Sequence, residues 1–96
     1  GRTPDAYSVS DTYPNPFNPE TTIRFELPWA SDMKVTVYND QGQVVRTLVN
    51  ETLSAGTFDI TWDGRDSNGR EVSTGMYLFL VEGPNLRTYK KVTFLK

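Results

Sequence analysis

Residues 58–81 read FDITW, then DGRDSNGREVST, then GMYLFLV, and they hold the clearest structural signal in the chain. The first run alternates large apolar residues with polar ones, the period-two pattern of a strand with one buried face. The last run is apolar at nearly every position, as in a strand at the centre of a sheet. Between them, Asn68-Gly69 suits a type I′ turn. We therefore predict that residues 58–62 and 75–81 pair as a hairpin.

This predicted hairpin also carries the heaviest apolar load in the sequence. Its largest side chains include Trp62, Tyr77 and Phe79, each able to bury on the order of 150–250 Å². The core is therefore expected here. Shorter runs with strand-like patterns lie on either side, separated by turns rich in Gly, Pro, Asn and Asp. They cover residues 7–9, 21–27, 33–38, 43–49 and 86–96.

About seven short strands without a sustained helical period favour an all-β fold, a two-sheet antiparallel immunoglobulin-like sandwich. We assign the sandwich to residues 13–96, and assign residues 1–12 to a linker that includes a possible first edge strand. The run at 43–49 also suits one helical turn, but its β-branched residues favour a strand. Residues 29–32 are expected to form a turn and residues 50–56 a loop. Because the chain begins abruptly at Gly1, we expect a module of a longer protein.

Composition narrows the range of functions. The chain has 96 residues, a net charge of −2, and neither cysteine nor histidine. The small charge argues against a nucleic-acid surface, and no apolar run approaches the roughly 20 residues needed to cross a bilayer. Without histidine, the commonest general base and metal ligand are missing, and no serine has a spacing that suggests another activating base. We expect no enzymatic activity, no cofactor, no nucleic-acid partner and no direct membrane insertion.

A proline-rich segment stands at residues 13–19, which read YPNPFNP. Proline removes an amide donor and pushes the preceding residue into extended geometry, so this segment is predicted to be a stiff, turned connector. Tyr13 and Phe17 are expected to pin it onto the sandwich. The segment either fixes strand register as a corner or serves as a docking surface, and the two roles are compatible.

The loop after residue 62 holds a weak candidate for a metal site. Asp63, Asp66 and Asn68 carry the oxygen ligands that calcium prefers. Their spacing does not match the helix-flanked calcium loop, however, and such residues often bond their own backbone amides in turns. The structural role is favoured, and no metal is assigned.

Two exposed side-chain groups remain. Trp29 and Tyr13 raise the possibility of a sugar-stacking platform, and Tyr38, Trp29 and Tyr89 would supply one if the fold placed them on one face. Otherwise Tyr13 packs onto the sandwich and Trp29 caps its end. Lys90, Lys91 and Lys96 cluster at the predicted C-terminal strand. They protect a solvated edge from pairing with other strands, or they are read by a receptor.

The segment that begins with YPNPFNPETTIRFELP at residues 13–28 resembles the opening of the type A C-terminal sorting domains of the type IX secretion system. Gly75-Met76-Tyr77 and the closing KKVTFLK of residues 90–96 resemble the two later motifs of that family, in the same order. Residues 62–77 are also similar to the immunoglobulin-like domain of the flagellar hook-capping protein.

The sorting-domain resemblance implies a non-catalytic module that directs a larger secreted protein through the periplasm and the outer membrane to the cell surface. Its partners would be an upstream passenger fused to the chain, an outer-membrane translocon, and a sortase-type peptidase. The cleavage point would lie within residues 1–10. The residues that match the family's motifs are Pro14, Asn15, Pro16, Phe17, Gly75, Tyr77, Lys90, Lys91 and Lys96. Met76 departs mildly from the family, where a β-branched residue is expected.

Two other functions stay open at this point. The chain would bind carbohydrate if it were an accessory module of a secreted glycoside hydrolase, and retention on insoluble polysaccharide would reveal this. It would assemble with hook subunits if it were a flagellar scaffold domain, which makes no use of residues 14–17.

Overall fold

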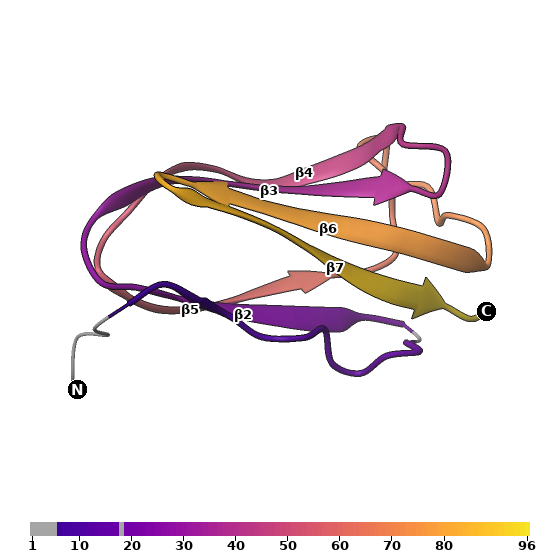
Figure 1. Ribbon diagram of the computed structural model, residues 1–96. Coiled ribbons are helices and arrows are strands. Elements are labelled where there is room, and N and C mark those ends of the chain that lie inside the picture. Colours follow the sequence, from indigo (N-terminus) through magenta and orange to yellow (C-terminus); the bar gives the residue numbers. More distant parts are fainter. Residues whose placement is uncertain (1–5, 18) are drawn as a thin grey trace.

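The computed structural model describes residues 6–17 and 19–96 as a sandwich of two antiparallel sheets (Figure 1). The three-stranded sheet has the order β1-β2-β5, and the four-stranded sheet has the order β4-β3-β6-β7. The first sheet comprises β1 (Ser8–Val9), β2 (Thr21–Leu27) and β5 (Gly56–Trp62). The second comprises β3 (Ser31–Asn39), β4 (Val44–Leu53), β6 (Gly75–Gly83) and β7 (Leu86–Phe94). The predicted immunoglobulin-like all-β sandwich is confirmed.

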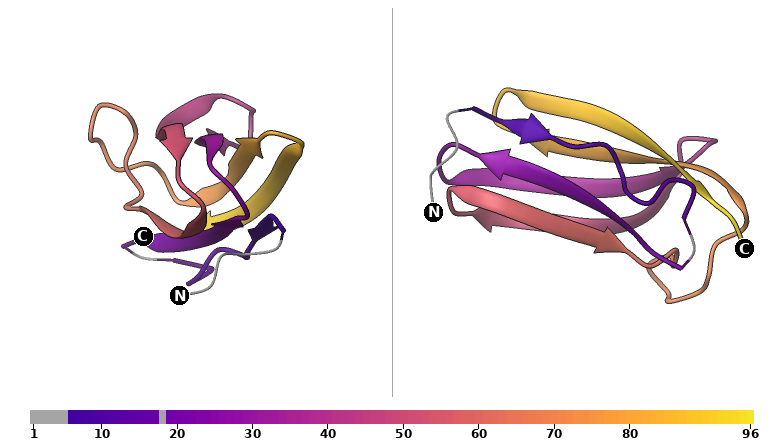
Figure 2. Two further views of the ribbon diagram at one scale, coloured as in Figure 1. Left: turned by 90° about the vertical axis from the view of Figure 1, so that its left-hand side faces the viewer. Right: turned by 90° about the horizontal axis from the view of Figure 1, so that it is seen from below.

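Figure 2 shows the two layers from two further sides. The hydrophobic core fills the space between these layers. In β2 the residues that alternate in the sequence alternate in burial, with Ile23, Phe25 and Leu27 completely buried. Trp62 at the end of β5 meets Tyr77 and Phe79 of β6 at ring-centroid distances of 5.2 and 5.9 Å. These are the three aromatic residues around which the core was predicted, and the prediction is confirmed.

The predicted hairpin between residues 58–62 and 75–81 is wrong. β5 pairs with β2 in the three-stranded sheet, whereas β6 lies between β3 and β7 in the opposite sheet. Each strand has an apolar face that points toward the other strand across the core, and this arrangement buries both of these faces. Residues 63–74 therefore cross between the sheets. Asn68-Gly69 belongs to a local turn closed by Gly69 N donating to Asp66 O at 3.0 Å, and only Gly69 of that pair has a positive φ (80°).

Two boundaries also differ from the predictions. Residues 50–53 extend β4 instead of beginning a loop, and Ser31 and Asp32 open β3 instead of closing a turn. β4 is an edge strand, so its polar residues at 50–52 face solvent while their backbone still pairs with β3. Polar composition alone suggested a loop. The run predicted at 43–49 is strand from Val44 onward, as its β-branched residues indicated.

The first strand is short and lies at the predicted position. Ser8 and Val9 pair with Glu26 and Phe25 of β2. Residues 1–5, which belong to the expected linker and make up half of the expected cleavage region, lie outside the described residues, and the boundary at residue 13 stays a prediction. No helix long and apolar enough to cross a membrane occurs in the described part of the chain.

Candidate functional site

The proline-rich segment bridges the two sheets. At its start Tyr13 exchanges backbone hydrogen bonds with Thr22 of β2, both of 2.9 Å. At its end Phe17 N donates to Thr93 O of β7 at 2.9 Å, and Leu95 N donates to Phe17 O at 3.1 Å. Because proline has no amide donor, Pro14 and Pro16 cannot continue a ladder between these points. The segment therefore joins one strand of each sheet.

Between these two anchors, the Asn15 side chain forms the hydrogen bonds with β7 that the backbone of the segment does not form. The Asn15 amide nitrogen donates to Lys91 O at 3.2 Å, and its amide oxygen accepts from Thr93 N at 2.9 Å. Thr12 Oγ1 also donates to Lys91 O, at 3.1 Å. An edge strand otherwise presents unpaired backbone groups to solvent. Asn15 thus takes the place of a neighbouring strand along part of β7.

Phe17 anchors the segment in the core. Its ring is 2% exposed and stacks on Phe94 at a centroid distance of 4.8 Å, with Trp62 at 5.4 Å. Tyr13 is 80% exposed, so the expectation that both aromatic residues pin the segment is correct for Phe17 and wrong for Tyr13. Tyr13 contributes its backbone to the bridge with β2, and its ring faces solvent.

The three sequence motifs meet in this region. Gly75 pairs in register with Phe94, and Tyr77 pairs with Val92, so the middle motif lies directly beside the terminal one. The Tyr77 hydroxyl donates to Ser73 O at 2.7 Å. The crossover between the sheets reaches the same place, because a Cβ added to Gly64 would lie 3.2 Å from the Phe94 ring. We call the unit formed by residues 14–17, 75–77 and 90–96 the motif cluster.

The three lysines of the motif cluster differ in their surroundings. Lys90 Nζ lies 3.2 Å from Asp11 Oδ1, with 25% of the lysine side chain exposed. Lys96 Nζ lies 3.5 Å from Glu71 Oε1. Lys91 is exposed, and its ammonium group has no partner in the part of the chain that the structure describes. Among the described residues, the basic end therefore comprises two lysines in ion pairs and one lysine without an ionic partner.

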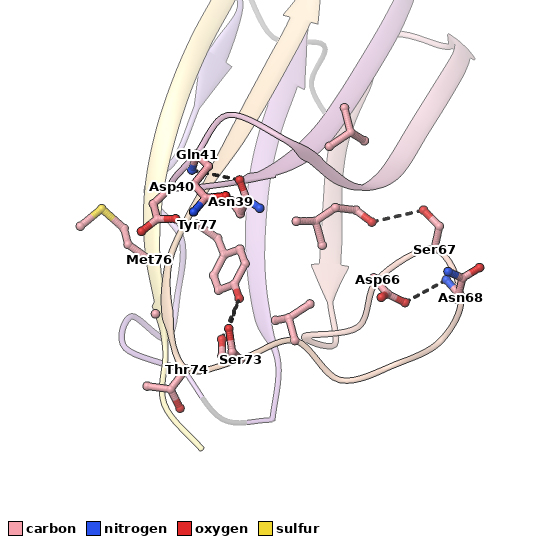
Figure 3. Close-up of a pocket in the computed structure, with 14 residues that line it drawn as sticks. Asn39, Asp40, Gln41, Asp66, Ser67, Asn68, Ser73, Thr74, Met76 and Tyr77 are labelled. Carbon is pink, nitrogen blue, oxygen red and sulfur yellow. Dashed lines mark hydrogen bonds between the residues drawn. The ribbon is translucent and has the colours of Figure 1, made fainter.

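A polar cleft of about 520 Å³ lies at the end of the sandwich beside Tyr77 (Figure 3). The turn between β3 and β4 and the crossover loop form its walls. The calcium candidates belong to this loop, and their carboxylates bond nearby groups. Asp66 Oδ1 accepts from the backbone amides of Asn68 and Arg70 at 2.9 and 3.0 Å.

Asp63 is used in a similar way. Its Oδ1 accepts from Arg46 Nη1 at 3.0 Å and from the backbone amide of Arg65 at 3.1 Å. Among the described residues, no group of three or more carboxylate, histidine or cysteine side chains is arranged to hold a metal ion. The contacts of Asp63 and Asp66 are those of turn residues that bond their own backbone and a neighbouring strand.

The aromatic candidates for a platform are divided between two places. Trp29 is 60% exposed and packs edge-on against Tyr7 at 5.8 Å, which agrees with a capping role. Tyr38 and Tyr89 share the outer face of the four-stranded sheet and line one groove there. Of the other groove residues, Lys91 was predicted as part of the terminal motif, whereas Leu78 and Leu80 at the centre of the groove were not predicted as site residues. The near-continuous apolar run of β6 was the available signal, since it indicates apolar residues on both faces of the strand.

Three exposed charged groups have shifted pKa values. Arg24 and Asp59 form a bidentate pair between β2 and β5, with N···O distances of 2.7 and 3.1 Å. This hydrogen bonding lowers the pKa of Asp59 and raises that of Arg24. On the other sheet, a hydrogen bond to the Tyr89 oxygen raises the pKa of Arg87.

Comparison with known proteins places this sandwich in a family. The family model described as the FlgD Ig-like domain matches residues 10–86. This chain belongs to the FlgD Ig-like domain family. The match includes residues 14–17 and Gly75-Met76-Tyr77 but ends before Lys90, so the terminal part of the motif cluster lies beyond it.

Relatives of this FlgD Ig-like domain are known by sequence and by structure. The basal-body rod modification protein FlgD of Salmonella typhimurium is 36% identical over 66 residues, which cover 68% of this chain and 28% of that protein. The Salmonella typhi protein of the same name matches equally. This chain therefore spans less than a third of the curated relatives it matches. The crystal structure of FlgD from P. aeruginosa shares 30% identity with a TM-score of 0.61, covering 75% of this chain and 61% of that one.

Two larger proteins of Porphyromonas gingivalis contain the same fold. Dimeric latent PorU has a TM-score of 0.70 at 22% identity and covers 99% of this chain and 10% of its own. PorZ, described as an essential bacterial surface component of the type-IX secretion system, has a TM-score of 0.58 at 21% identity, covering 96% of this chain and 12% of its own. At these identities the likeness shows a shared fold.

Proposed function

We propose that this FlgD Ig-like domain is a non-catalytic C-terminal sorting module of the type IX secretion system. It would direct a larger protein, fused upstream, across the outer membrane and to the bacterial cell surface. The outer-membrane translocon would recognise the folded domain, and a sortase-type peptidase would act near the upstream junction. No cofactor, nucleic acid or membrane insertion is part of this proposal.

The observation that carries the proposal is the motif cluster. Three short motifs, far apart in the sequence, pack into one unit through the Phe17–Phe94 stack and the register of Tyr77 with Val92. Asn15 adds hydrogen bonds to Lys91 and Thr93 within the same unit. A rigid surface assembled in this way lowers the ordering cost when a partner binds.

The structural comparisons add support of a limited kind. PorU and PorZ each contain a region that covers nearly all of this chain, and PorZ is described as a surface component of the type-IX system. A module of this fold therefore occurs within large proteins of that setting. The proposal that this chain serves export itself rests on the motif cluster.

A flagellar role is the second candidate, and the family match favours it. FlgD of Salmonella typhimurium is described as a basal-body rod modification protein. The family match ends at residue 86, whereas the sorting proposal makes use of Lys90, Lys91 and Lys96. Substitution of these lysines therefore separates the two candidates.

The test joins this chain to the C-terminus of a reporter that carries a periplasmic export signal, in a host with type IX machinery. We expect the reporter to become accessible to externally added protease. The same reporter without the chain should stay in the periplasm. A folded intact fusion that also stays in the periplasm would refute the sorting role.

The variant arm replaces Lys90, Lys91 and Lys96 together by glutamine. This change keeps the buried Val92 and Phe94, so the fold should survive. We expect the reporter to accumulate in the periplasm, and thermal unfolding of the variant domain checks that it is folded. A matched triple variant of Lys34, Arg46 and Arg70, which lie outside the motif cluster, should be displayed normally. Equal display of both variants would argue against recognition of the terminal lysines.

A further inference from the structure

The outer face of the four-stranded sheet has an apolar floor. Leu78 and Leu80 alternate with Phe79 and Val81, which belong to the core, so their side chains lie on the opposite face of β6. Leu80 is only 3% exposed, although it is not part of the core cluster between the sheets. Side chains on the outer face of the sheet therefore cover most of the Leu80 side chain.

Side chains from both flanking strands enclose this floor. Tyr38 of β3 pairs with Leu78, and Tyr89 of β7 pairs with Leu80. The result is a groove of about 600 Å³ on the sheet surface. It is lined by Tyr38, Gly42, Leu78, Leu80, Arg87, Tyr89 and Lys91.

The groove has cations at its rim, and none of the described residues that line it is a carboxylate. The Arg87 guanidinium donates to the Tyr89 hydroxyl at 3.2 Å and lies 5.9 Å from the centroid of that ring. Glu82 pairs in register with Arg87 beyond the lining residues. Lys91, paired in register with Leu78, has no ionic partner among the described residues.

Exposed apolar side chains extend the groove along the sheet. Met76 lies on the same face of β6 and is 48% exposed, and Tyr89 is 51% exposed. Contiguous apolar surface bordered by charge marks interaction sites on monomeric proteins. The aliphatic floor suits apolar side chains better than a flat sugar ring, for which a coplanar aromatic platform is needed.

We propose that this groove docks an extended acidic segment of a partner protein. Apolar side chains of the segment cover Leu78 and Leu80, and its carboxylates pair with Arg87 and Lys91. The inference goes beyond the export proposal and does not depend on it. It also assigns different roles to adjacent lysines: Lys91 contacts the partner, whereas Lys90 forms the ion pair with Asp11 within the domain.

The test titrates the isotopically labelled 96-residue chain with a short capped peptide of alternating phenylalanine and glutamate, followed by NMR. We expect saturable shifts at the amides of Leu78, Leu80 and Tyr89, and weaker binding as salt screens the charges. A peptide with lysine in place of glutamate should not bind. Absence of saturable shifts, shifts centred elsewhere, or equal binding of the lysine peptide would overturn the proposal.

Charge-reversal variants sharpen the result. Lys91→Glu and Arg87→Glu should each lower the affinity for the acidic peptide by about fivefold to tenfold. Each substitution replaces an attraction between opposite charges at the rim by a repulsion between like charges. Lys96→Glu, outside the groove, is the control and should bind like the parent chain. Equal affinity of all three variants would contradict the assignment. Retention on insoluble polysaccharide that depends on Tyr38, without peptide binding, would identify a glycan site instead.

Discussion

Phe17 shows how one side chain decides the role of a whole segment. Proline restricts the backbone around it, but the position of the segment depends on the burial of this ring against Phe94 and Trp62. Tyr13, in the same segment, contributes only its backbone to the bridge with β2. The two aromatic residues look equivalent in the sequence and differ greatly in exposure.

We therefore predict that Phe17→Ala lowers the free energy of unfolding by about 3–5 kcal/mol, the usual cost of removing a buried phenylalanine ring. Tyr13→Ala is the matched control and should change it by less than about 0.5 kcal/mol, because its ring is exposed. Urea unfolding followed by tryptophan fluorescence measures both. Similar losses for the two variants would show that the segment is not anchored through Phe17.

At the scale of the elements, strand pairing explains what each motif does. β2 and β5 form one sheet through a full register from Thr21–Trp62 to Leu27–Gly56, and Arg24 and Asp59 face each other within it. β7 needs cover for its outer edge, and Asn15 supplies part of it. The same strand presents Lys91 to the outer groove and Lys90 to Asp11, because adjacent residues of a strand point to opposite faces.

The Arg24–Asp59 pair makes a small contribution to stability that depends on pH. The pKa of Asp59 is lowered in the folded chain, so the contribution is present above the ordinary value of 3.8 and is lost as the pH falls through the folded value. We expect Arg24→Gln to lower the melting temperature slightly at neutral pH. The difference from the parent chain should vanish well below pH 3.8. A melting-temperature difference between the two chains that stays constant from neutral pH to well below pH 3.8 would contradict this linkage.

The whole molecule depends on its last strand. Val92 and Phe94 are both buried in the core, and β7 contacts β6 along its full length as well as the proline-rich segment. A small domain has a net stability of only roughly 5–15 kcal/mol, so losing these contacts together exceeds what it can tolerate. The C-terminal residues therefore serve both folding and the proposed recognition.

Ending the chain at Tyr89 should consequently abolish the fold. We expect poorly dispersed amide NMR signals and no cooperative thermal transition. Ending it at Leu95 is the control: it removes the exposed Lys96 and one surface ion pair, so it should cost at most about 1 kcal/mol. A cooperative transition in the chain that ends at Tyr89 would show that half of β7 is dispensable.

The local pattern of the chain was sufficient to predict its strands and their buried faces. β2 occupies the predicted residues 21–27, and β5 alternates in burial as expected, because a strand's side-chain period of two is visible in adjacent residues. The resemblance of the motifs to a known family likewise came from short segments, and their role in sorting stays a proposal. The turn at Asn68-Gly69 was readable too, but the hairpin inferred from it was wrong.

Only the tertiary structure decided which strands pair and which motif residues meet. β5 and β6 could each bury an apolar face by packing across the core, and this non-local gain outweighs a local turn preference. For the same reason, Phe17 is buried while Tyr13 is exposed, and Lys90 pairs with Asp11 while Lys91 has no ionic partner among the described residues. Such differences depend on side chains from distant strands, which adjacent sequence does not reveal.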